Sequence, residues 1–218
     1  MAEVRAGYGP RIAALATALG VTLLVVAAVP FLRAYADPAA RQPATAIGVG
    51  LDRAGCDPEL TDPISGAGVH VGPGTAQPYV TRIQYDLVPP SSGPHFVVPA
   101  PTVRRFYTAR DRPPIETLVH NLEHGYAVLW YVEPLAHDQI EALRALARTF
   151  GADRYGGRFV VAPWDPGYGA FPAGRPLALS HWGAHAGYRQ FCAAVSGAAV
   201  ERFVLAHPAG DAPEPTGM

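Results

Sequence analysis

The segment His120-Asn121-Leu122-Glu123-His124-Gly125 carries two imidazoles and a carboxylate within five residues. On a helix, residues four apart share a face, so His120 and His124 can point into one space with Glu123 beside them. Imidazole nitrogen suits a borderline cation such as Zn²⁺, and an open coordination position would let a bound water react. A polar helix end is the alternative, because the helix dipole alone favours histidine near a C-terminus. The motif therefore predicts a metal site.

Two loop histidines could complete such a site. His95 follows Pro89-Pro90-Ser91-Ser92-Gly93-Pro94, whose prolines and glycine fix an extended or turning backbone. His70 has glycines nearby in Gly68-Val69-His70-Val71-Gly72, which permits close backbone approach. Either histidine could instead bond a backbone carbonyl. We predict four metal ligands and one hydrogen-bonding partner or general base: His120, His124, His95 and His70 as the ligands, and Glu123 as the partner or base.

The remaining composition narrows the metal and the class of protein. Methionine occurs only as Met1 and Met218, which argues against a thioether copper(I) site and leaves Zn²⁺ or Cu²⁺. A net charge of -1 with 16% charged residues predicts a globular domain without affinity for nucleic acid. Serine hydrolase, phosphate-loop and C-x-x-C motifs are absent. Of the other histidines, His181 lies in a predicted strand whose register decides its role, and three have the character of surface residues: His137, His185 and His207.

An uncharged segment precedes the histidines. Residues 12–32 carry no charge and, as a helix, are long enough to cross a hydrocarbon core of about 30 Å. The segment is long for a signal peptide, although Ala34-Tyr35-Ala36 offers a cleavage site. The flanking arginines favour a cytoplasmic N-terminus. We expect a short tail at residues 1–11, an uncleaved transmembrane anchor at 12–32, a linker at 33–55, and a domain outside the cytoplasm at the cell membrane.

The only cysteines, Cys56 and Cys192, both follow this segment. An even pair outside the cytoplasm predicts a disulfide. In the chain-entropy model a loop of that length stabilises the fold by about 4 to 5 kcal/mol, and it would tie the start of the domain to its end. Two free thiols are the alternative if the domain is cytoplasmic.

The predicted elements place the histidine motif at the end of a helix. Residues 79–85 alternate β-branched and aromatic side chains, which predicts a strand before the His95 loop. A short helix is predicted from Pro113 to His124, with Gly125 after its C-cap. Further strands are expected at 126–132, 159–164 and 176–182, the last two as a long hairpin, and further helices at 137–150 and 196–206. This order is typical of an α+β domain with helices packed on a small mixed or antiparallel sheet, here over residues 56–210 and followed by a Pro-rich tail at 211–218.

Two motifs resemble those of the domain of unknown function 3105 family. They are Tyr85-x-x-x-Pro89-Pro90-Ser91-Ser92-Gly93-Pro94-His95, and His120 to Gly125 followed by an apolar strand. The sequence is also similar at His70-Val71, at residues 178–183 and at Pro213-Glu214-Pro215, so the resemblance covers roughly residues 50 to 215. It implies a bacterial protein, often with one N-terminal membrane segment and an extracytoplasmic domain, and it assigns no activity.

Three functions fit these observations. The first is a membrane-anchored extracytoplasmic protein that binds Zn²⁺ or Cu²⁺ through its histidine cluster. The second is a metal-dependent hydrolase with Glu123 as general base, for which the H-x-x-E-H order is suggestive, although the rest of an inverzincin is missing. The third is a structural or interaction module of the cell envelope, in which His95 bonds the backbone and the imidazoles point apart. We expect binding rather than catalysis.

Overall fold

The computed structural model of the protein describes residues 43–152 and 155–217. Five strands form a mixed sheet in the order β1-β7-β6-β4-β5, and β2 pairs separately with β3. The strands are β1 (Leu60–Asp62), β2 (His70–Val71), β3 (His95–Phe96), β4 (Ala127–Tyr131), β5 (Phe159–Pro163), β6 (Leu177–Trp182) and β7 (Gly187–Cys192). The α-helices are α3 (Ile115–Glu123), α4 (His137–Phe150) and α5 (Gly197–Ala206), and the 3-10 helices are η1 (Ala44–Ala46), η2 (Leu51–Arg53), η4 (Pro166–Tyr168) and η5 (Ala209–Asp211).

These elements confirm the predicted α+β class with a mixed sheet. The predicted transmembrane segment at 12–32 lies outside the described residues. Within the described ranges, the helices are all too short or too polar to cross a bilayer.

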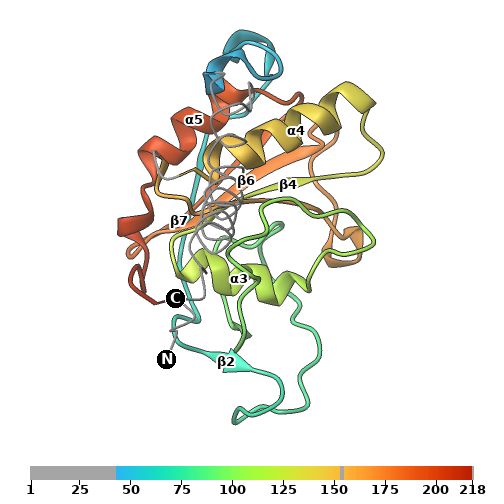
Figure 1. Ribbon diagram of the computed structural model, residues 1–218. Coiled ribbons are helices and arrows are strands. Elements are labelled where there is room, and N and C mark those ends of the chain that lie inside the picture. The colour runs from blue at the N-terminus through green and yellow to red at the C-terminus, as the bar shows by residue number, and fades with distance from the viewer. Residues whose placement is uncertain (1–42, 153–154, 218) are drawn as a thin grey trace, which may run out of the picture. The chain divides into compact units, whose positions relative to one another are not determined.

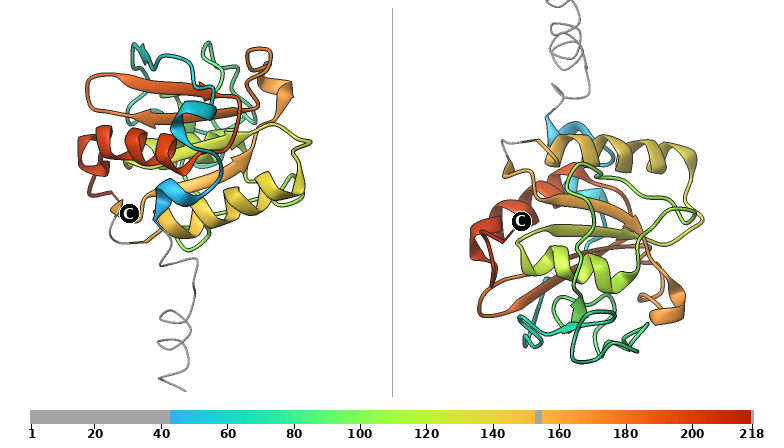
Figure 2. Two further views of the ribbon diagram at one scale, coloured as in Figure 1. Left: turned by 90° about the horizontal axis from the view of Figure 1, so that it is seen from above. Right: turned by 60° about the horizontal axis from the view of Figure 1, so that its bottom comes forward.

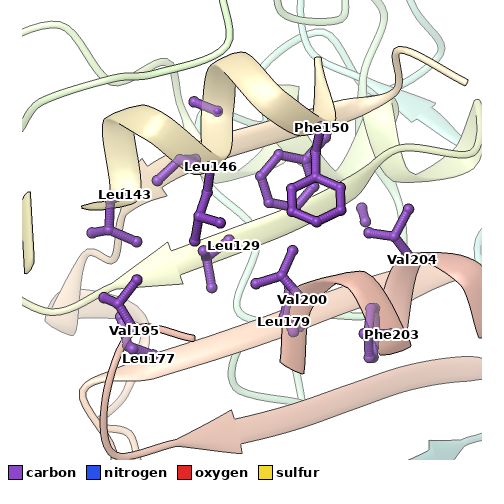
Figure 3. Close-up of a cluster of buried hydrophobic side chains, with 14 of the residues drawn as sticks. Leu129, Leu143, Leu146, Phe150, Leu177, Leu179, Val195, Val200, Phe203 and Val204 are labelled. Atoms are coloured by element: carbon purple, nitrogen blue, oxygen red, sulfur yellow. The ribbon is translucent and has the colours of Figure 1, made fainter. Parts of the chain in front are cut away.

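Helices cover both faces of the five-stranded sheet, α4 and α5 on one face and α3 on the other (Figure 1 and Figure 2). The apolar run that forms β4 explains this layering, because successive side chains of a strand point to opposite faces. Leu129 faces α4 and α5, whereas Val128 and Trp130 face α3. Figure 3 shows Leu146 and Phe150 of α4 and side chains of α5 directed toward the sheet. A strand buried on both faces is a rigid support for α3, which carries the histidine motif.

The domain begins earlier in the chain than the predicted linker allows. Ala44 and Ile47 are buried in the core under α4 and α5. The backbone is tied in as well, because Val49 N–H donates to the Val195 carbonyl at 2.8 Å. Residues 44–54, which the sequence analysis placed in the linker 33–55, therefore belong to the folded domain.

Residues 79–85 do not form the predicted strand. The Ile83 N–H donates to the Glu116 carboxylate at 2.7 Å instead of to a neighbouring strand. Arg82 lies over the ring of Tyr168, with its Cζ 3.9 Å from the ring centroid. Tyr79 is 93% exposed. Contacts with Glu116 of α3 and Tyr168 of η4 thus hold this segment in place. Its alternating sequence pattern does not correspond to a strand.

The predicted hairpin of residues 159–164 with 176–182 is also wrong. β4 lies between these strands, parallel to β5 and antiparallel to β6. α4 connects β4 to β5, as a parallel pair requires a crossover. The true hairpin partner of β6 is β7, whose sequence Gly-Tyr-Arg-Gln-Phe-Cys was not identified as a strand.

A buried ion pair joins β7 to β1 and to the loop before His95. Arg189 Nε and Nη2 donate to the two Asp62 carboxylate oxygens at 2.6 and 2.8 Å. Ser91 Oγ donates to the same carboxylate at 2.8 Å, and Arg189 Nη1 donates to the Val88 carbonyl at 2.9 Å. Burial acts to raise the pKa of the Asp62 carboxyl, but the hydrogen bonds from Arg189 and Ser91 hold it below its ordinary value. The pair therefore fixes both ends of the 88–91 segment that leads to His95.

Replacing Arg189 with methionine should lower the free energy of unfolding by about 3 to 5 kcal/mol, because the Asp62 charge would stay buried without its partner. The double variant Asp62→Leu, Arg189→Met should recover most of this loss, since no charge is then left uncompensated. Urea unfolding curves of the three proteins measure both values. A single variant as stable as the wild type would show that the ion pair does not anchor the loop.

Candidate metal centre

β2 and β3 bring His70 and His95 together. The two strands pair in parallel with His70 opposite His95 and Val71 opposite Phe96, so the two imidazoles lie on one face. The centroids of their rings are 4.9 Å apart. The preceding loop is held in place because Tyr85 Oη donates to the Pro94 carbonyl at 2.8 Å. Residues far apart in the sequence therefore present two ring nitrogens to one point.

α3 supplies the other half of the cluster. The helix follows Pro113-Pro114 and ends at Glu123, with His124 as its C-cap. Gly125 adopts a left-handed conformation with φ 82°, and a Cβ there would lie 2.3 Å from the Ala209 carbonyl oxygen. A residue with a side chain is therefore excluded, and the glycine stop predicted from the sequence is confirmed. The helix ends where His120 and Glu123 face the β2–β3 pair.

Three histidines and one glutamate converge in the interior. One possible ligand atom from each side chain lies within 4.8 Å of the others, in a group formed by His70, His95, His120 and Glu123. The His120 ring centroid is 5.0 Å from that of His70 and 4.7 Å from that of His95. His95 and Glu123 are fully buried, and His120 is 5% exposed. A tetrahedral zinc site needs ligand atoms about 3.3 Å apart, so a small contraction would suit a metal.

The hydrogen bonds of the outer ring nitrogens fix the tautomers. His95 Nδ1 lies 2.9 Å from the Gly93 carbonyl oxygen, and His120 Nδ1 lies 2.6 Å from that of Phe96. Because a carbonyl only accepts, each Nδ1 carries the proton and donates it. In the neutral rings, both Nε2 atoms then hold a free electron pair directed into the cluster. This backbone-oriented arrangement is the one that metal-binding histidines adopt.

Several polar atoms at the centre of the cluster have no hydrogen bond. His95 Nε2 and Glu123 Oε2 form a close pair at 2.9 Å, and neither atom has another polar partner among the described residues. His70 Nε2 is buried and has no hydrogen-bond partner among the described residues either. Buried polar atoms are nearly always paired, and leaving one unpaired costs about 1 to 3 kcal/mol. Three such atoms at one point form a group that could hold a cation.

The protonation of the cluster also suits a cation. Burial, reinforced by the neighbouring imidazoles, lowers the pKa of His120 to about 4, so this ring is uncharged at neutral pH. Burial acts to raise the pKa of Glu123, but the His95 imidazole and the Gly68 N–H, which donates to Glu123 Oε1 at 2.6 Å, hold it below its ordinary value. The cluster thus offers a carboxylate and a neutral His120, the protonation state that a metal needs.

His124 lies next to this group and joins a second one. Its Nε2 is 2.8 Å from His120 Nε2, while its Nδ1 is 3.0 Å from the Glu214 carbonyl oxygen. Since both Nδ1 atoms donate to carbonyls, two electron pairs face each other unless a proton or a metal ion lies between them. His124 also groups with Glu123 and Glu214, whose side chain is 48% exposed. His124 therefore lies between the buried cluster and the surface.

The structure places the predicted site residues close together with two changes of role. His70, His95 and His120 converge as expected, Glu123 joins them as a potential ligand, and His124 lies at the edge. The sequence analysis did not identify Glu214, although Glu214 N–H donates to the Glu123 carbonyl at 3.1 Å. The motif Pro213-Glu214-Pro215 was its only signal. The predicted tail at 211–218 therefore packs against the site over its described part.

The remaining histidines lie elsewhere. His181 is fully buried, and its ring nitrogens have no hydrogen-bond partner in the described part of the chain. Burial lowers its pKa to about 4. His207 was predicted at the surface but is 8% exposed, stacked on Tyr188 with ring centroids 3.9 Å apart and 3.0 Å from Glu59. The prediction was wrong because His207, the C-cap of α5, is covered by the rings of Tyr188 and Phe203. His137 and His185 are exposed, as predicted.

The predicted disulfide is confirmed. Cys56 and Cys192 are bonded across a sequence separation of 136 residues. Cys192 ends β7 and is buried in the core, and Cys56 packs against the same core. The bond thus attaches the segment before β1 to the adjacent C-terminal end of β7.

Comparison with known protein families places part of this chain in a family. The family model described as a protein of unknown function (DUF3105) matches residues 77–218. This range includes His95, His120, Glu123 and His124, and it begins after His70. No curated protein and no solved structure matches the chain.

Proposed function

We propose that this chain, which belongs to the DUF3105 family, binds one divalent transition metal ion, Zn²⁺ or Cu²⁺, through His70, His95, His120 and Glu123. The observation that carries the proposal is the convergence of buried imidazole nitrogens and a carboxylate oxygen without hydrogen bonds. Three imidazole nitrogens and one carboxylate oxygen match the ligand preference of zinc and copper(II).

The burial of the cluster favours binding over catalysis. Structural zinc sites use four protein ligands, whereas catalytic sites use three and leave one position to water. With Glu123 as the fourth ligand, the coordination sphere is complete, and a carboxylate bound to the metal is not free to act as the general base. The hydrolase reading thus lacks the base that the sequence motif suggested.

The interaction-module reading predicted two features of the histidines. The first, a hydrogen bond from His95 to the backbone, is present, because His95 Nδ1 donates to the Gly93 carbonyl. The second, imidazoles that point apart, is absent, since the rings of His70, His95 and His120 converge at centroid distances of 4.7 to 5.0 Å. A backbone bond at Nδ1 also leaves Nε2 available, which supports metal binding equally well.

We further propose that the protein is anchored in the cell membrane by residues 12–32, with the folded domain outside the cytoplasm. The disulfide supports this location, because such bonds persist in oxidising compartments and are rare in the cytosol. Protease digestion of intact cells and of spheroplasts tests it. Cleavage of the domain without disrupting the cell membrane is expected, and full protection in intact spheroplasts would contradict the orientation.

Metal titration tests the binding proposal. The full-length chain, purified in an uncharged detergent and stripped with a chelator, should take up one Zn²⁺ per chain in competition with a chromogenic chelator. The triple variant His70→Ala, His95→Ala, His120→Ala should take up none at this site, while the exposed pair His137→Ala, His185→Ala should behave as the wild type. Equal uptake by all three proteins would exclude the site.

Copper binding can be followed inside the protein. The ring of Trp182 lies 5.9 Å from the ring of His95 and is fully buried. Cu²⁺ quenches nearby indole fluorescence, so stoichiometric Cu²⁺ should reduce the emission of the wild type more than that of a Trp182→Phe variant. Equal quenching in the two proteins would place the ion elsewhere.

A further inference from the structure

A cleft lined by four arginines lies between α4 and residues 103–106, and it shares no lining residue with the histidine cluster. It has a volume of about 340 Å³, at the lower end of the range for small-molecule sites. Arg144 and Arg148 of α4 form one side, and Arg104 and Arg105 of the segment between β3 and α3 form the other. Phe106 and Val103 add an apolar part, and Val103 is 90% exposed. Among the described residues, no carboxylate lines the cleft.

Aromatic rings hold three of these guanidinium groups. Arg144 Cζ is 4.2 Å from the centroid of the Phe106 ring. Arg104 lies over Tyr107 at 4.7 Å and Arg105 over Tyr126 at 5.5 Å. A cation over a ring face is attracted by the π-system, and the N–H groups of a guanidinium lie in its own plane. Ring contacts therefore position the arginines while leaving N–H donors for a ligand.

Carboxylates balance only part of this charge. Arg104 pairs with Asp111, and Arg144 lies 3.5 Å from Glu141, and all four side chains are between 37% and 53% exposed. Such exposed pairs contribute little. Arg105 donates to Tyr126 Oη at 3.2 Å, and neither Arg105 nor Arg148 has a carboxylate partner in the part of the chain that the structure describes. The cleft therefore keeps excess positive charge.

The positions of the two arginines on α4 are electrostatically unfavourable unless an anion lies between them. Arg144 and Arg148 are four residues apart on one helix face, where like charges repel. The helix dipole favours Arg148 in the last turn, but it does not account for the three other arginines around the same space. A bound anion would offset the repulsion among all of them.

We propose that this cleft binds a small organic phosphate, with the arginines on the phosphate oxygens and the organic part against Phe106 and Val103. Guanidinium groups match phosphate geometry and hold it with paired N–H donors. Four donors around one space suit a group with several acceptor oxygens better than a single carboxylate. The phosphate can come from a lipid headgroup, which is a diester, or from a soluble monoester. The inference is independent of metal binding.

Calorimetric titration of the full-length chain in an uncharged detergent tests this inference at fixed ionic strength. Phenyl phosphate represents a soluble monoester, and glycerophosphoglycerol represents a lipid headgroup diester. The wild type should bind at least one of them, and Arg144→Gln, Arg148→Gln should weaken that binding at least about tenfold, the loss of more than one charge-assisted contact. Tighter binding of the diester would identify a lipid source, and tighter binding of the monoester a soluble one.

Matched variants separate the cleft from overall charge. Arg53→Gln, Arg202→Gln removes the same charge from exposed positions outside the cleft and should leave binding unchanged. Val103→Asp adds a carboxylate at the cleft without touching the core and should also weaken binding about tenfold, whereas Leu205→Asp on α5, at a site 65% exposed, should not. Equal weakening by the two double variants, or no binding of either compound to the wild type, would overturn the inference.

Discussion

Replacing His120 with alanine is expected to lower the affinity for Zn²⁺ by at least about a hundredfold, because changes even outside the ligand shell cost 10- to 100-fold. His120 is central to the cluster, with ring centroids of His70, His95 and His124 all within 5.0 Å of its own. The same variant should lose most of the rise in thermal unfolding temperature that zinc gives the wild type, since a ligand stabilises only the state that binds it. Competition titration and thermal unfolding measure the two effects.

Two further variants show whether the effect is specific to the cluster. His124→Ala should lose about tenfold or less, because its ring lies beside His120 but outside the group of four. His185→Ala, at an exposed position, should bind as the wild type does. Unchanged affinity in a folded His120→Ala protein would contradict the assignment of this residue as a ligand.

Removing the disulfide by Cys56→Ala, Cys192→Ala is expected to lower the free energy of unfolding by about 5 kcal/mol. The bond closes a loop with a sequence separation of 136 residues, and the loss follows from the chain entropy that such a loop removes from the unfolded state. Tryptophan fluorescence during guanidinium unfolding gives the value.

The wild type after reduction serves as the control for this variant, because it loses the bond but keeps both side chains. It should be destabilised by a similar amount. A loss below about 1 kcal/mol in both proteins would mean that the unfolded chain is not restrained by this loop. Zinc affinity of the folded variant should be unchanged, since neither cysteine belongs to the cluster.

The fold could be predicted where the apolar pattern is strong. The helix at 137–150 and the strands at 126–132 and 159–164 were correct within two residues because their side chains face the core directly. β7 was missed because Arg189 and Gln190 interrupt its apolar pattern, and only the pairing of Arg189 with Asp62 makes burial possible. β1 is too short for a periodic signal. Both strands are held by contacts between residues that are far apart in the sequence, which a local sequence pattern does not show.

The site could be predicted by residue type but not by role. The spacing of His120 and Glu123 and the Pro-rich approach to His95 indicated a metal centre, and the structure brings these residues together. Helical spacing suggested His124 as the partner of His120, and His124 does lie beside it, but the parallel pairing of two-residue strands brings His70 and His95 into one group with His120. A ladder this short leaves no pattern in the sequence, so the set of proposed ligands depends on tertiary contacts.

X-ray absorption spectroscopy of the zinc-loaded chain tests the central claim most directly, because it measures the atoms bound to the metal. The cluster of His70, His95, His120 and Glu123 predicts three imidazole nitrogens and one oxygen at about 2.0 to 2.2 Å, without sulfur. In the triple alanine variant of the three histidines, the imidazole signal should be absent. A wild-type spectrum with fewer than two imidazoles, or with water oxygens in most positions, would contradict the account.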